Sequence, residues 1–284
     1  MRRIIHLSDL HFGKTDPRLE RPLLRKIDEL APDLVIVSGD FTQRARRHQF
    51  AQARAFLNRI KAPVLAVPGN HDTPLDNVLV RFVTPWRRYR QAIDRELEPE
   101  WRDARVHVVG VNTVNRFKWQ RGRIGPHTIR RVCSSFSAVP RDVLRIVVMH
   151  HPLEHGPETD KKLMEGASHA LRRLSKCGAD IVLSGHLHEG SAAPFHAAPG
   201  LLFVQAGTGL STRLRGTPNM FNLLEHQTAG EVSITRYLSS SEGKFAPEAV
   251  RHFRKTAQDW SEVASPSPIE ATSHDMIRSV AFAP

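Results

Sequence analysis

Five short polar clusters carry the side chains of this 284-residue chain that are best suited to hold metal ions. Each cluster follows an apolar stretch of strand length, and together they contain aspartate, histidine and asparagine but no cysteine. Such ligands suit Mn, Fe, Zn or similar first-row ions, and they do not suit Ca or a thiolate zinc site. In chain order the clusters are Asp9-Leu10-His11, Gly39-Asp40, Gly69-Asn70-His71-Asp72, His150-His151-Pro152 and Gly185-His186-Leu187-His188.

The spacing within the clusters favours convergence on one point. Positions i and i+2 of an extended chain point the same way, so Asp9 is expected to pair with His11, and His186 with His188. Glycines before Asp40, Asn70 and His186 permit sharp exits from the strands. A single such pair is common on loop surfaces. The full ordered set, each member after an apolar strand, predicts a metal site.

Hydrophobic periodicity indicates the elements that must position these clusters. Alternating strands and helices predict an α/β protein, in which ligands collect at the carboxyl ends of strands. Beyond about residue 200 the strands follow one another without helices, which predicts a second sheet. Strands are expected at 4–8, 34–37, 64–67, 106–111, 145–149, 181–183, 201–205, 220–224 and 232–238, and helices at 19–30, 50–60, 129–136 and 163–176.

The periodic pattern stops near residue 238. Residues 239–284 contain Ser239-Ser240-Ser241 and the run Ser265-Pro266-Ser267-Pro268 without a clear period. We therefore expect one domain over residues 1–238, followed by a tail at 239–284 that is loosely attached or disordered.

The composition limits which binding partners and which cellular compartment are expected for the protein. The net charge is +12, which is compatible with steering of phosphate substrates, with nucleic acid as a partner, or simply with a solvated basic surface. No apolar run reaches the ~20 residues of a membrane span, and the N-terminus lacks a signal-peptide pattern. Cys133 and Cys177 match no zinc or redox spacing, so we expect idle thiols in a cytoplasmic protein. The sequence does not predict an oligomeric state.

The complete pattern resembles the calcineurin-like metallophosphoesterase family over about residues 4 to 210. The resemblance implies a four-layer α/β/β/α sandwich of two mixed sheets, with two divalent or mixed-valence metal ions whose identity stays open. By that resemblance Asp40 bridges the two ions. The remaining ligands are Asp9, His11 and His188 on one ion, and Asn70, His150 and His186 on the other, with His151 as the alternative to His150.

Three further residues receive roles from the same resemblance. His71 is expected beside the substrate, where it stabilises the transition state or protonates the leaving oxygen. Asp72 either orients His71 or caps the turn after the motif. Arg44 either binds phosphate or holds its loop. The implied reaction is attack on phosphorus by a hydroxide that bridges the metals.

The motifs leave the substrate open, because the chemistry is shared across the family. The stretches around Gly39-Asp40 and Gly69-Asn70-His71-Asp72 are similar to bacterial class III cyclic nucleotide phosphodiesterases, which favours small phosphodiesters and 3′,5′-cyclic nucleotides in particular. The alternatives are a UDP-diacylglucosamine-type pyrophosphate hydrolase with Phe82 to Trp101 as a lid, a DNA-processing nuclease, and a non-catalytic metal-binding interaction module. The last would be expected to lack some of the motifs, and none is missing.

Overall fold

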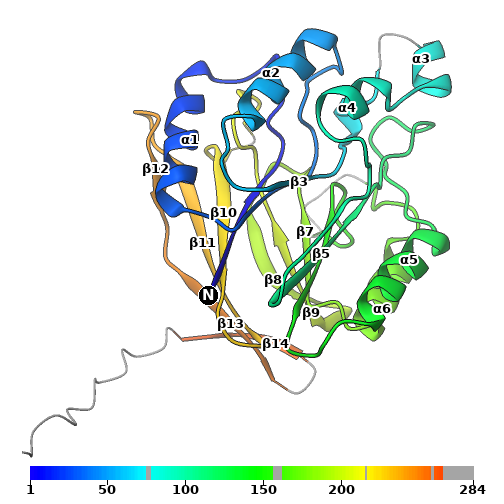
Figure 1. The fold of residues 1–284 in the computed structure, drawn as a ribbon, viewed down its shortest axis with the longest axis vertical. Helices are drawn as coiled ribbons and strands as arrows, with labels where there is room; N and C mark the ends of the chain where they lie inside the picture. The colour runs from blue at the N-terminus through cyan, green and yellow to red at the C-terminus, as the bar shows by residue number, and fades with distance from the viewer. Residues whose placement is uncertain (75–77, 156–161, 215, 257–258, 265–284) are drawn as a thin grey trace, which may run out of the picture.

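Two mixed β-sheets pack face to face, and helices cover both outer faces (Figure 1). The computed structural model describes residues 1–284 except 75–77, 156–161, 215, 257–258 and 265–284. This arrangement is the predicted four-layer α/β/β/α sandwich.

The first sheet has the strand order β14-β13-β11-β10-β1-β2-β3, and β12 pairs with β11. Its three N-terminal strands run parallel, and the later strands join by antiparallel pairing. The strands are β1 (Arg2–Leu7), β2 (Leu34–Val37), β3 (Val64–Ala66), β10 (Met220–His226), β11 (Glu231–Ser239), β12 (Phe245–Pro247), β13 (Arg251–Thr256) and β14 (Asp259–Val263).

The second sheet has the order β4-β5-β6-β7-β9-β8. Its four central strands are parallel, and the two edge strands are antiparallel to their neighbours. The strands are β4 (Glu100–Arg102), β5 (Val106–Val111), β6 (Leu144–Met149), β7 (Ile181–Ser184), β8 (Ser191–Phe195) and β9 (Ala198–Gln205).

The four longer helices, α1, α2, α5 and α6, each pack an apolar stripe against a sheet. α1 begins with Pro17 after Asp16, whose carboxylate accepts from the Arg18 backbone N–H and so caps the helix. Its buried face consists of leucines and Ile27 at helical spacing. The helices are α1 (Pro17–Leu30), α2 (Arg47–Leu57), α3 (Val78–Val83), α4 (Arg87–Ala92), α5 (Pro126–Ser137) and α6 (Ala167–Lys176), with a 3-10 turn η1 (Asn70–Asp72).

Three hydrophobic layers hold the sandwich together. Strand β1 is buried on both faces: Ile4 packs between the sheets, whereas Ile5 and Leu7 pack in the layer that includes α1 and α2. A third layer lies between the second sheet and the pair α5 and α6. Burial on both faces explains why these strands appear in the sequence as continuous apolar runs.

The domain extends past residue 238, where the sequence analysis had ended it. Strands β12, β13 and β14 continue the first sheet to Val263, and Phe253 and Trp260 are buried between the sheets. Charged residues such as Arg251 and Glu262 alternate with these buried ones, so the segment lacks an apolar run. Residues 265–284 of the expected tail lie outside the described residues.

The two cysteines are bonded to each other, which corrects the expectation of idle thiols. Cys133 of α5 and Cys177 at the end of α6 form a disulfide with Cα atoms 5.4 Å apart. The packing of the two helices brings them together from 44 residues apart in sequence.

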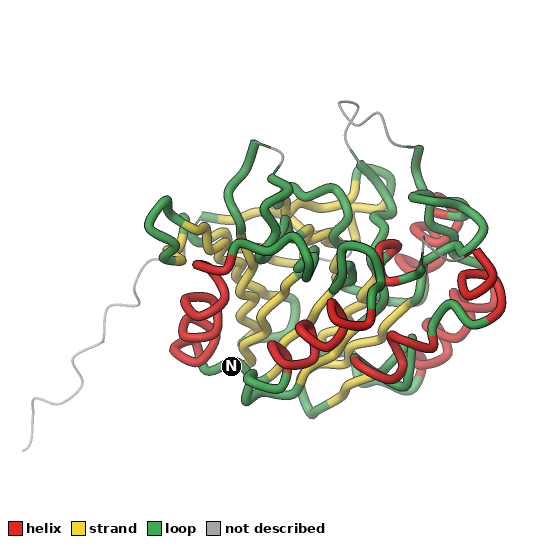
Figure 2. The backbone as a smooth tube through the Cα atoms, turned by 90° about the horizontal axis from the view of Figure 1, so that it is seen from above, coloured by secondary structure: helices red, strands yellow, loops and turns green. Residues whose placement is uncertain are grey.

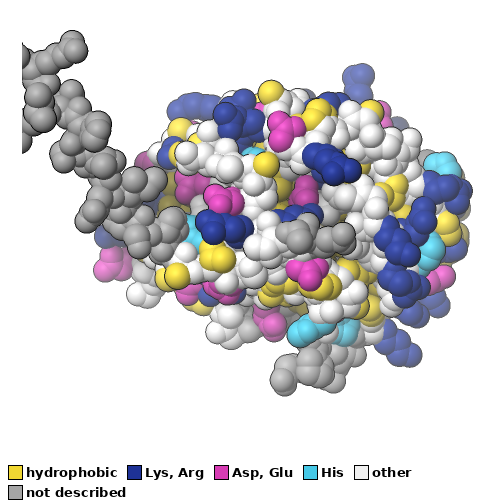
Figure 3. Space-filling view, turned by 90° about the horizontal axis from the view of Figure 1, so that it is seen from below, with side chains coloured by type: hydrophobic (Ala, Val, Ile, Leu, Met, Phe, Trp, Pro, Cys, Tyr) yellow, Lys and Arg dark blue, Asp and Glu magenta, His cyan; other side chains and the backbone are white. Residues whose placement is uncertain are grey.

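Among the described residues, no helix is long and apolar enough to cross a membrane. The positive charge is spread over the surface. Figure 3 shows Lys and Arg side chains gathered at one edge of the face seen from below, on the side of the molecule where α5 and α6 lie in Figure 1.

Candidate metal centre

The five polar clusters meet at one edge of the sandwich. β1, β2 and β3 are parallel within the first sheet, and β6 and β7 are parallel within the second. The loops after these strands carry the clusters and lie on the side that Figure 2 views from above. Buried side chains from both sheets come within hydrogen-bond distance of one another there: Asp9 and His11 approach His188, and Asp40 and Asn70 approach His150.

Left-handed backbone conformations aim many of these side chains. Asp9 and His11 have φ of 51° and 52°, Asp40 has 54°, and His186 and His188 have 73° and 66°. The expectation of an extended chain at Asp9 and His11, and at His186 and His188, is therefore wrong, because extended residues have negative φ. A non-glycine residue in this region costs about 1–2 kcal/mol. Such strain concentrates at functional sites, where the surrounding structure holds it.

Two glycines let the loops approach within contact of the site carboxylates. A Cβ at Gly185 would lie 1.8 Å from Ser8 Oγ and 2.6 Å from Asp9 Oδ2, and one at Gly69 would lie 2.1 Å from Asp40 Oδ1. These positions therefore require glycine for close approach of two segments.

The first cluster consists of Asp9, His11 and His188. Asp9 Oδ1 lies 3.5 Å from His11 Nε2 and 3.2 Å from His188 Nε2, and the two imidazole nitrogens are 3.2 Å apart. The other carboxylate oxygen, Oδ2, accepts from Ser8 Oγ and from the His186 backbone N–H. Oδ1 itself is buried without a hydrogen-bond donor. A buried carboxylate oxygen without a donor, facing two imidazole nitrogens, fits coordination of a cation.

The second cluster consists of Asp40, Asn70, His150 and His186. His150 Nε2 lies 3.1 Å from Asn70 Oδ1, 3.3 Å from His186 Nδ1 and 3.4 Å from Asp40 Oδ2. The same Asp40 oxygen is 3.9 Å from His11 Nε2 in the first cluster. Asp40 is thus the carboxylate between the two groups.

His150 and His151 both lie near His186. The Nδ1 atom of His150 is 2.8 Å from the Ser38 carbonyl, which accepts its N–H and leaves Nε2 facing Asp40 and Asn70. His151 Nδ1 is instead 2.8 Å from Thr113 Oγ1. Of the two, His150 is the one whose ring nitrogen lies near the Asp40 carboxylate.

Electrostatics tie the two clusters together. Burial alone would raise the pKa of Asp40, but His150, His71 and His11 hold it well below its usual range. Burial likewise opposes protonation of His150, yet Asp40 raises its pKa to about 9. Asp40 thus favours a proton on His150. A metal ion binds the neutral imidazole and would take the place of that proton.

His71 is held by the backbone carbonyl of Gln43 rather than by Asp72. Its Nδ1 is 2.8 Å from the Gln43 carbonyl, so that nitrogen donates and Nε2 faces the clusters. Burial lowers the pKa of His71. Asp72 instead accepts from the backbone N–H groups of Phe41, Thr42 and Gly69. These contacts fit the turn-capping alternative, with Asp72 clamping two motif loops together.

Arg44 lies outside the clusters. Its side chain is exposed, and its guanidinium lies 6.0 Å from the centre of the Trp119 ring. Its backbone N–H donates to Gln49 Oε1, which holds the turn before α2. Among the described contacts it does not reach the metal ligands.

Comparison with known proteins decides the family. Residues 2–190 match the model of the calcineurin-like phosphoesterase family. The chain belongs to that family. The resemblance noted in the sequence is thereby confirmed for this calcineurin-like phosphoesterase.

Curated relatives match only a part of this chain. It is 36% identical over 73 residues to the UDP-2,3-diacylglucosamine pyrophosphatase LpxG of Chlamydia muridarum, covering 25% of this chain and 22% of that protein. It is 31% identical over 80 residues to the glycerophosphodiester phosphodiesterase GpdQ of Enterobacter lignolyticus, covering 24% of this chain and 29% of that protein. These matches span less than a third of either relative.

Solved structures share the fold across most of the chain. A dimetal phosphatase from Danio rerio superposes with a TM-score of 0.62 at 11% identity, covering 87% of this chain and 98% of that one. The purple acid phosphatase of yellow lupin (Lupinus luteus) also gives 0.62, at 15% identity, covering 87% of this chain and 52% of that one.

The metallophosphoesterase site also contains a positively charged side chain, Arg213, that belongs to none of the five motifs. Arg213 Nη1 lies 3.5 Å from His71 Nε2 and 3.4 Å from Gln43 Oε1. The Arg213 carbonyl lies 3.1 Å from His188 Nδ1 and accepts its N–H, which orients that ring. In the sequence Arg213 stands only near another arginine, Arg215, and in none of the five polar clusters. No spacing rule links it to His71, because the two are 142 residues apart.

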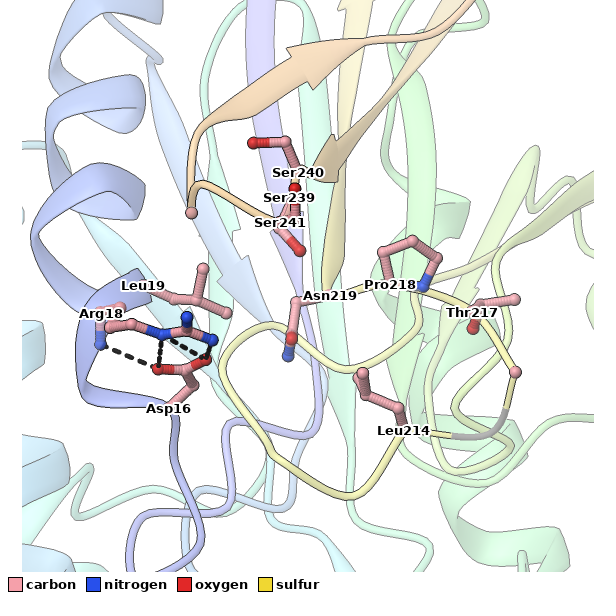
Figure 4. A pocket seen from close by; sticks show the side chains of 12 residues that line it. Asp16, Arg18, Leu19, Leu214, Thr217, Pro218, Asn219, Ser239, Ser240 and Ser241 are labelled. Carbon is pink, nitrogen blue, oxygen red and sulfur yellow. Dashed lines mark hydrogen bonds and ion pairs between the residues drawn. The ribbon is translucent and has the colours of Figure 1, made fainter.

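A separate cavity of about 470 Å³ lies behind the loop that carries Arg213. Figure 4 shows Asp16 and Arg18 paired on one side of it, with Leu214 and Asn219 on another. None of the residues in the two clusters lines this cavity. It is therefore distinct from the metal centre of this calcineurin-like phosphoesterase.

Proposed function

We propose that this phosphoesterase is a binuclear metal-dependent phosphodiesterase acting on small phosphodiesters. The observation that carries the proposal is the convergence of two ligand clusters on Asp40, whose carboxylate is 3.9 Å from His11 Nε2 and 3.4 Å from His150 Nε2. The proposed ligands of one ion are Asp9, His11, Asp40 and His188. Those of the other are Asp40, Asn70, His150 and His186.

The donor set fits two first-row ions. It offers imidazole nitrogens, carboxylate oxygens and one carboxamide oxygen, all buried, and it includes an Asp9 oxygen without a donor. Two ions bound there would supply positive charge to the phosphoryl oxygens and would lower the pKa of a coordinated water, so that hydroxide is available near neutral pH.

Side chains of the protein carry out the remaining steps. His71 is held through Nδ1 by the Gln43 carbonyl, so Nε2 is the free ring nitrogen, and in the imidazolium form of His71 it would give its proton to the leaving oxygen. Arg213, 3.5 Å from that atom, binds a phosphate oxygen and stabilises the charge that develops in the transition state. Asp72 fixes the loops after β2 and β3, which carry Asp40 and Asn70.

Two observations support a diester as the substrate. The partial match to a glycerophosphodiester phosphodiesterase favours this class. The motif stretches that are similar to class III cyclic nucleotide phosphodiesterases make 3′,5′-cyclic nucleotides the first candidates within it. A second candidate is a pyrophosphate that joins a nucleotide to a lipid, favoured by the partial match to LpxG.

The test is hydrolysis by metal-stripped protein resupplied separately with Mn, Fe, Zn or Ni. The substrates are bis-p-nitrophenyl phosphate, p-nitrophenyl phosphate, cyclic AMP and a UDP-diacylglucosamine. Asp40→Ala removes the shared carboxylate, and His169→Ala, an exposed histidine on α6, is the matched control. We expect metal-dependent turnover of a diester in the wild type and in the control, and none in Asp40→Ala.

The substrate panel separates the candidates. Turnover of cyclic AMP supports the cyclic-nucleotide assignment, and cleavage of the lipid pyrophosphate alone favours the second candidate. No turnover with any metal would overturn the proposal and leave a non-catalytic metal-binding module.

A further inference from the structure

Large apolar side chains are exposed together beside the metal centre. Among the described residues, eight large hydrophobic side chains are exposed, and five of them lie on α3 and on the loop 112–123. We call these five the apolar patch: Leu79, Phe82, Val83, Phe117 and Trp119, exposed by 73%, 41%, 66%, 65% and 53%. Contiguous exposed apolar side chains mark an interaction surface.

The two segments of the apolar patch form one unit. The rings of Phe82 and Phe117 stack with centroids 5.6 Å apart. Arg81 donates from Nε to the Arg116 carbonyl at 2.7 Å and from Nη2 to the Lys118 carbonyl at 2.9 Å, and Arg116 donates to the Phe82 carbonyl. Figure 1 shows α3 above the loop that precedes α5, at the upper right. The apolar side chains are therefore presented outward by a braced scaffold.

The two segments that carry the apolar patch are basic in sequence. Residues 78–93 contain four arginines and no Asp or Glu, and residues 112–124 contain three arginines, one lysine and no Asp or Glu. Arg116 lies over the Phe117 ring and Arg44 near the Trp119 ring. This charge is complementary to an anionic surface.

The two segments that carry the apolar patch also contact the metal-site loops directly. Arg81 Nη1 lies 3.3 Å from Thr73 Oγ1, in the residue after Asp72. At the other end of the loop, Thr113 Oγ1 is 2.8 Å from His151 Nδ1, and a Cβ at Gly122 would lie 2.5 Å from the same imidazole. A surface bound to the apolar patch would thus lie beside the rim of the metal centre.

We propose that the apolar patch docks the protein on an anionic phospholipid surface. Its most exposed members, Leu79 and Val83, are aliphatic and suit acyl chains, whereas a single-stranded nucleic acid is bound by aromatic stacking. Trp119 has the amphipathic ring that favours the membrane interface. Docking in this way places the metal centre next to lipid phosphoesters. The inference does not depend on which phosphodiester the centre hydrolyses.

The test is co-sedimentation of the full metal-loaded chain with phosphatidylglycerol vesicles and with phosphatidylcholine vesicles. The triple variant Leu79→Gln, Val83→Gln, Phe117→Gln changes exposed side chains alone, and Val250→Gln is a matched exposed apolar control elsewhere on the surface. We expect wild type and control to bind the anionic vesicles, and the triple variant to bind them at least tenfold more weakly with equal turnover of bis-p-nitrophenyl phosphate.

Trp119 reports insertion independently. Vesicles with brominated acyl chains should quench the tryptophan emission of the wild type, and Trp119→Phe should lose most of that quenching. Failure to sediment with anionic vesicles, or quenching unchanged in Trp119→Phe, would overturn the proposal. So would preferential binding of a single-stranded oligonucleotide that the triple variant abolishes, which would assign the surface to nucleic acid.

Discussion

The guanidinium of Arg213 lies 3.5 Å from Nε2 of His71, although the two residues are 142 positions apart in the sequence. One loop follows β3, and the other leads from β9 to β10. The same Arg213 holds His188 through its carbonyl. The backbone of this residue therefore positions a proposed metal ligand, while its side chain faces the proposed substrate position.

This division of roles predicts a selective effect of Arg213→Ala. The carbonyl that accepts from His188 remains, so bound metal should be unchanged. Loss of the cation should lower kcat/KM for a diester by about 30-fold or more, roughly 2 kcal/mol of transition-state stabilisation. Steady-state kinetics together with metal analysis measure both effects. Arg254→Ala, an exposed arginine of β13 paired with Glu231, is the control. A parallel loss of metal and activity would contradict the assignment.

Gly185→Ala should destroy the first cluster. The added Cβ would lie 1.8 Å from Ser8 Oγ and 2.6 Å from Asp9 Oδ2, which would push apart the loops that carry Asp9 and His186. We expect a loss of about 1–3 kcal/mol in the free energy of unfolding, as for other overpacked sites, and a loss of bound metal. Gly125→Ala is a matched control, because a Cβ there has no neighbour within 4 Å and the residue has φ of −95°. Tight metal binding by Gly185→Ala would show that the loops can separate without cost.

The sequence predicted the sandwich and the meeting of its polar clusters because both depend on local patterns. Apolar runs such as Leu34 to Val37 mark strands, and each motif follows its strand directly. Contacts between distant loops carry no such signature. Arg213 approaches His71, and Cys133 meets Cys177, only through packing of whole elements. The sequence did not predict strand β14, because its outward residues are charged and the buried Trp260 alone does not make an apolar run.

His6 should make the protein less stable in acid. It is fully buried in β1, with Nε2 2.9 Å from Ser38 Oγ, and burial lowers its pKa to about 3 although Asp9 opposes this. The folded state therefore keeps His6 neutral while the unfolded chain takes up a proton below about pH 6.5. Stability from this residue is present above that pH and is lost as the pH falls towards 3.

His6→Gln keeps a hydrogen-bonding side chain and removes this titration. Between pH 6.5 and 4 the wild type should lose about 3 kcal/mol more unfolding free energy than the variant, at about 1.4 kcal/mol per pH unit. Urea unfolding at each pH, under identical metal conditions, gives the difference. The exposed His169→Gln should follow the wild type. Parallel curves for His6→Gln and the wild type would show that His6 is not kept neutral.

The disulfide should stabilise the fold without affecting the chemistry. Cys133 and Cys177 join α5 and α6 and close a loop 44 residues long, and neither contacts the metal clusters among the described residues. Loop closure of that length is worth up to about 4 kcal/mol in the free energy of unfolding. The double variant Cys133→Ala, Cys177→Ala should therefore melt at a clearly lower temperature and retain the kcat/KM of the wild type at 25 °C. A reducing agent should lower the melting temperature of the wild type and leave that of the double variant unchanged. Equal melting temperatures for reduced and oxidised wild type would mean that the helix packing alone holds this edge of the sandwich.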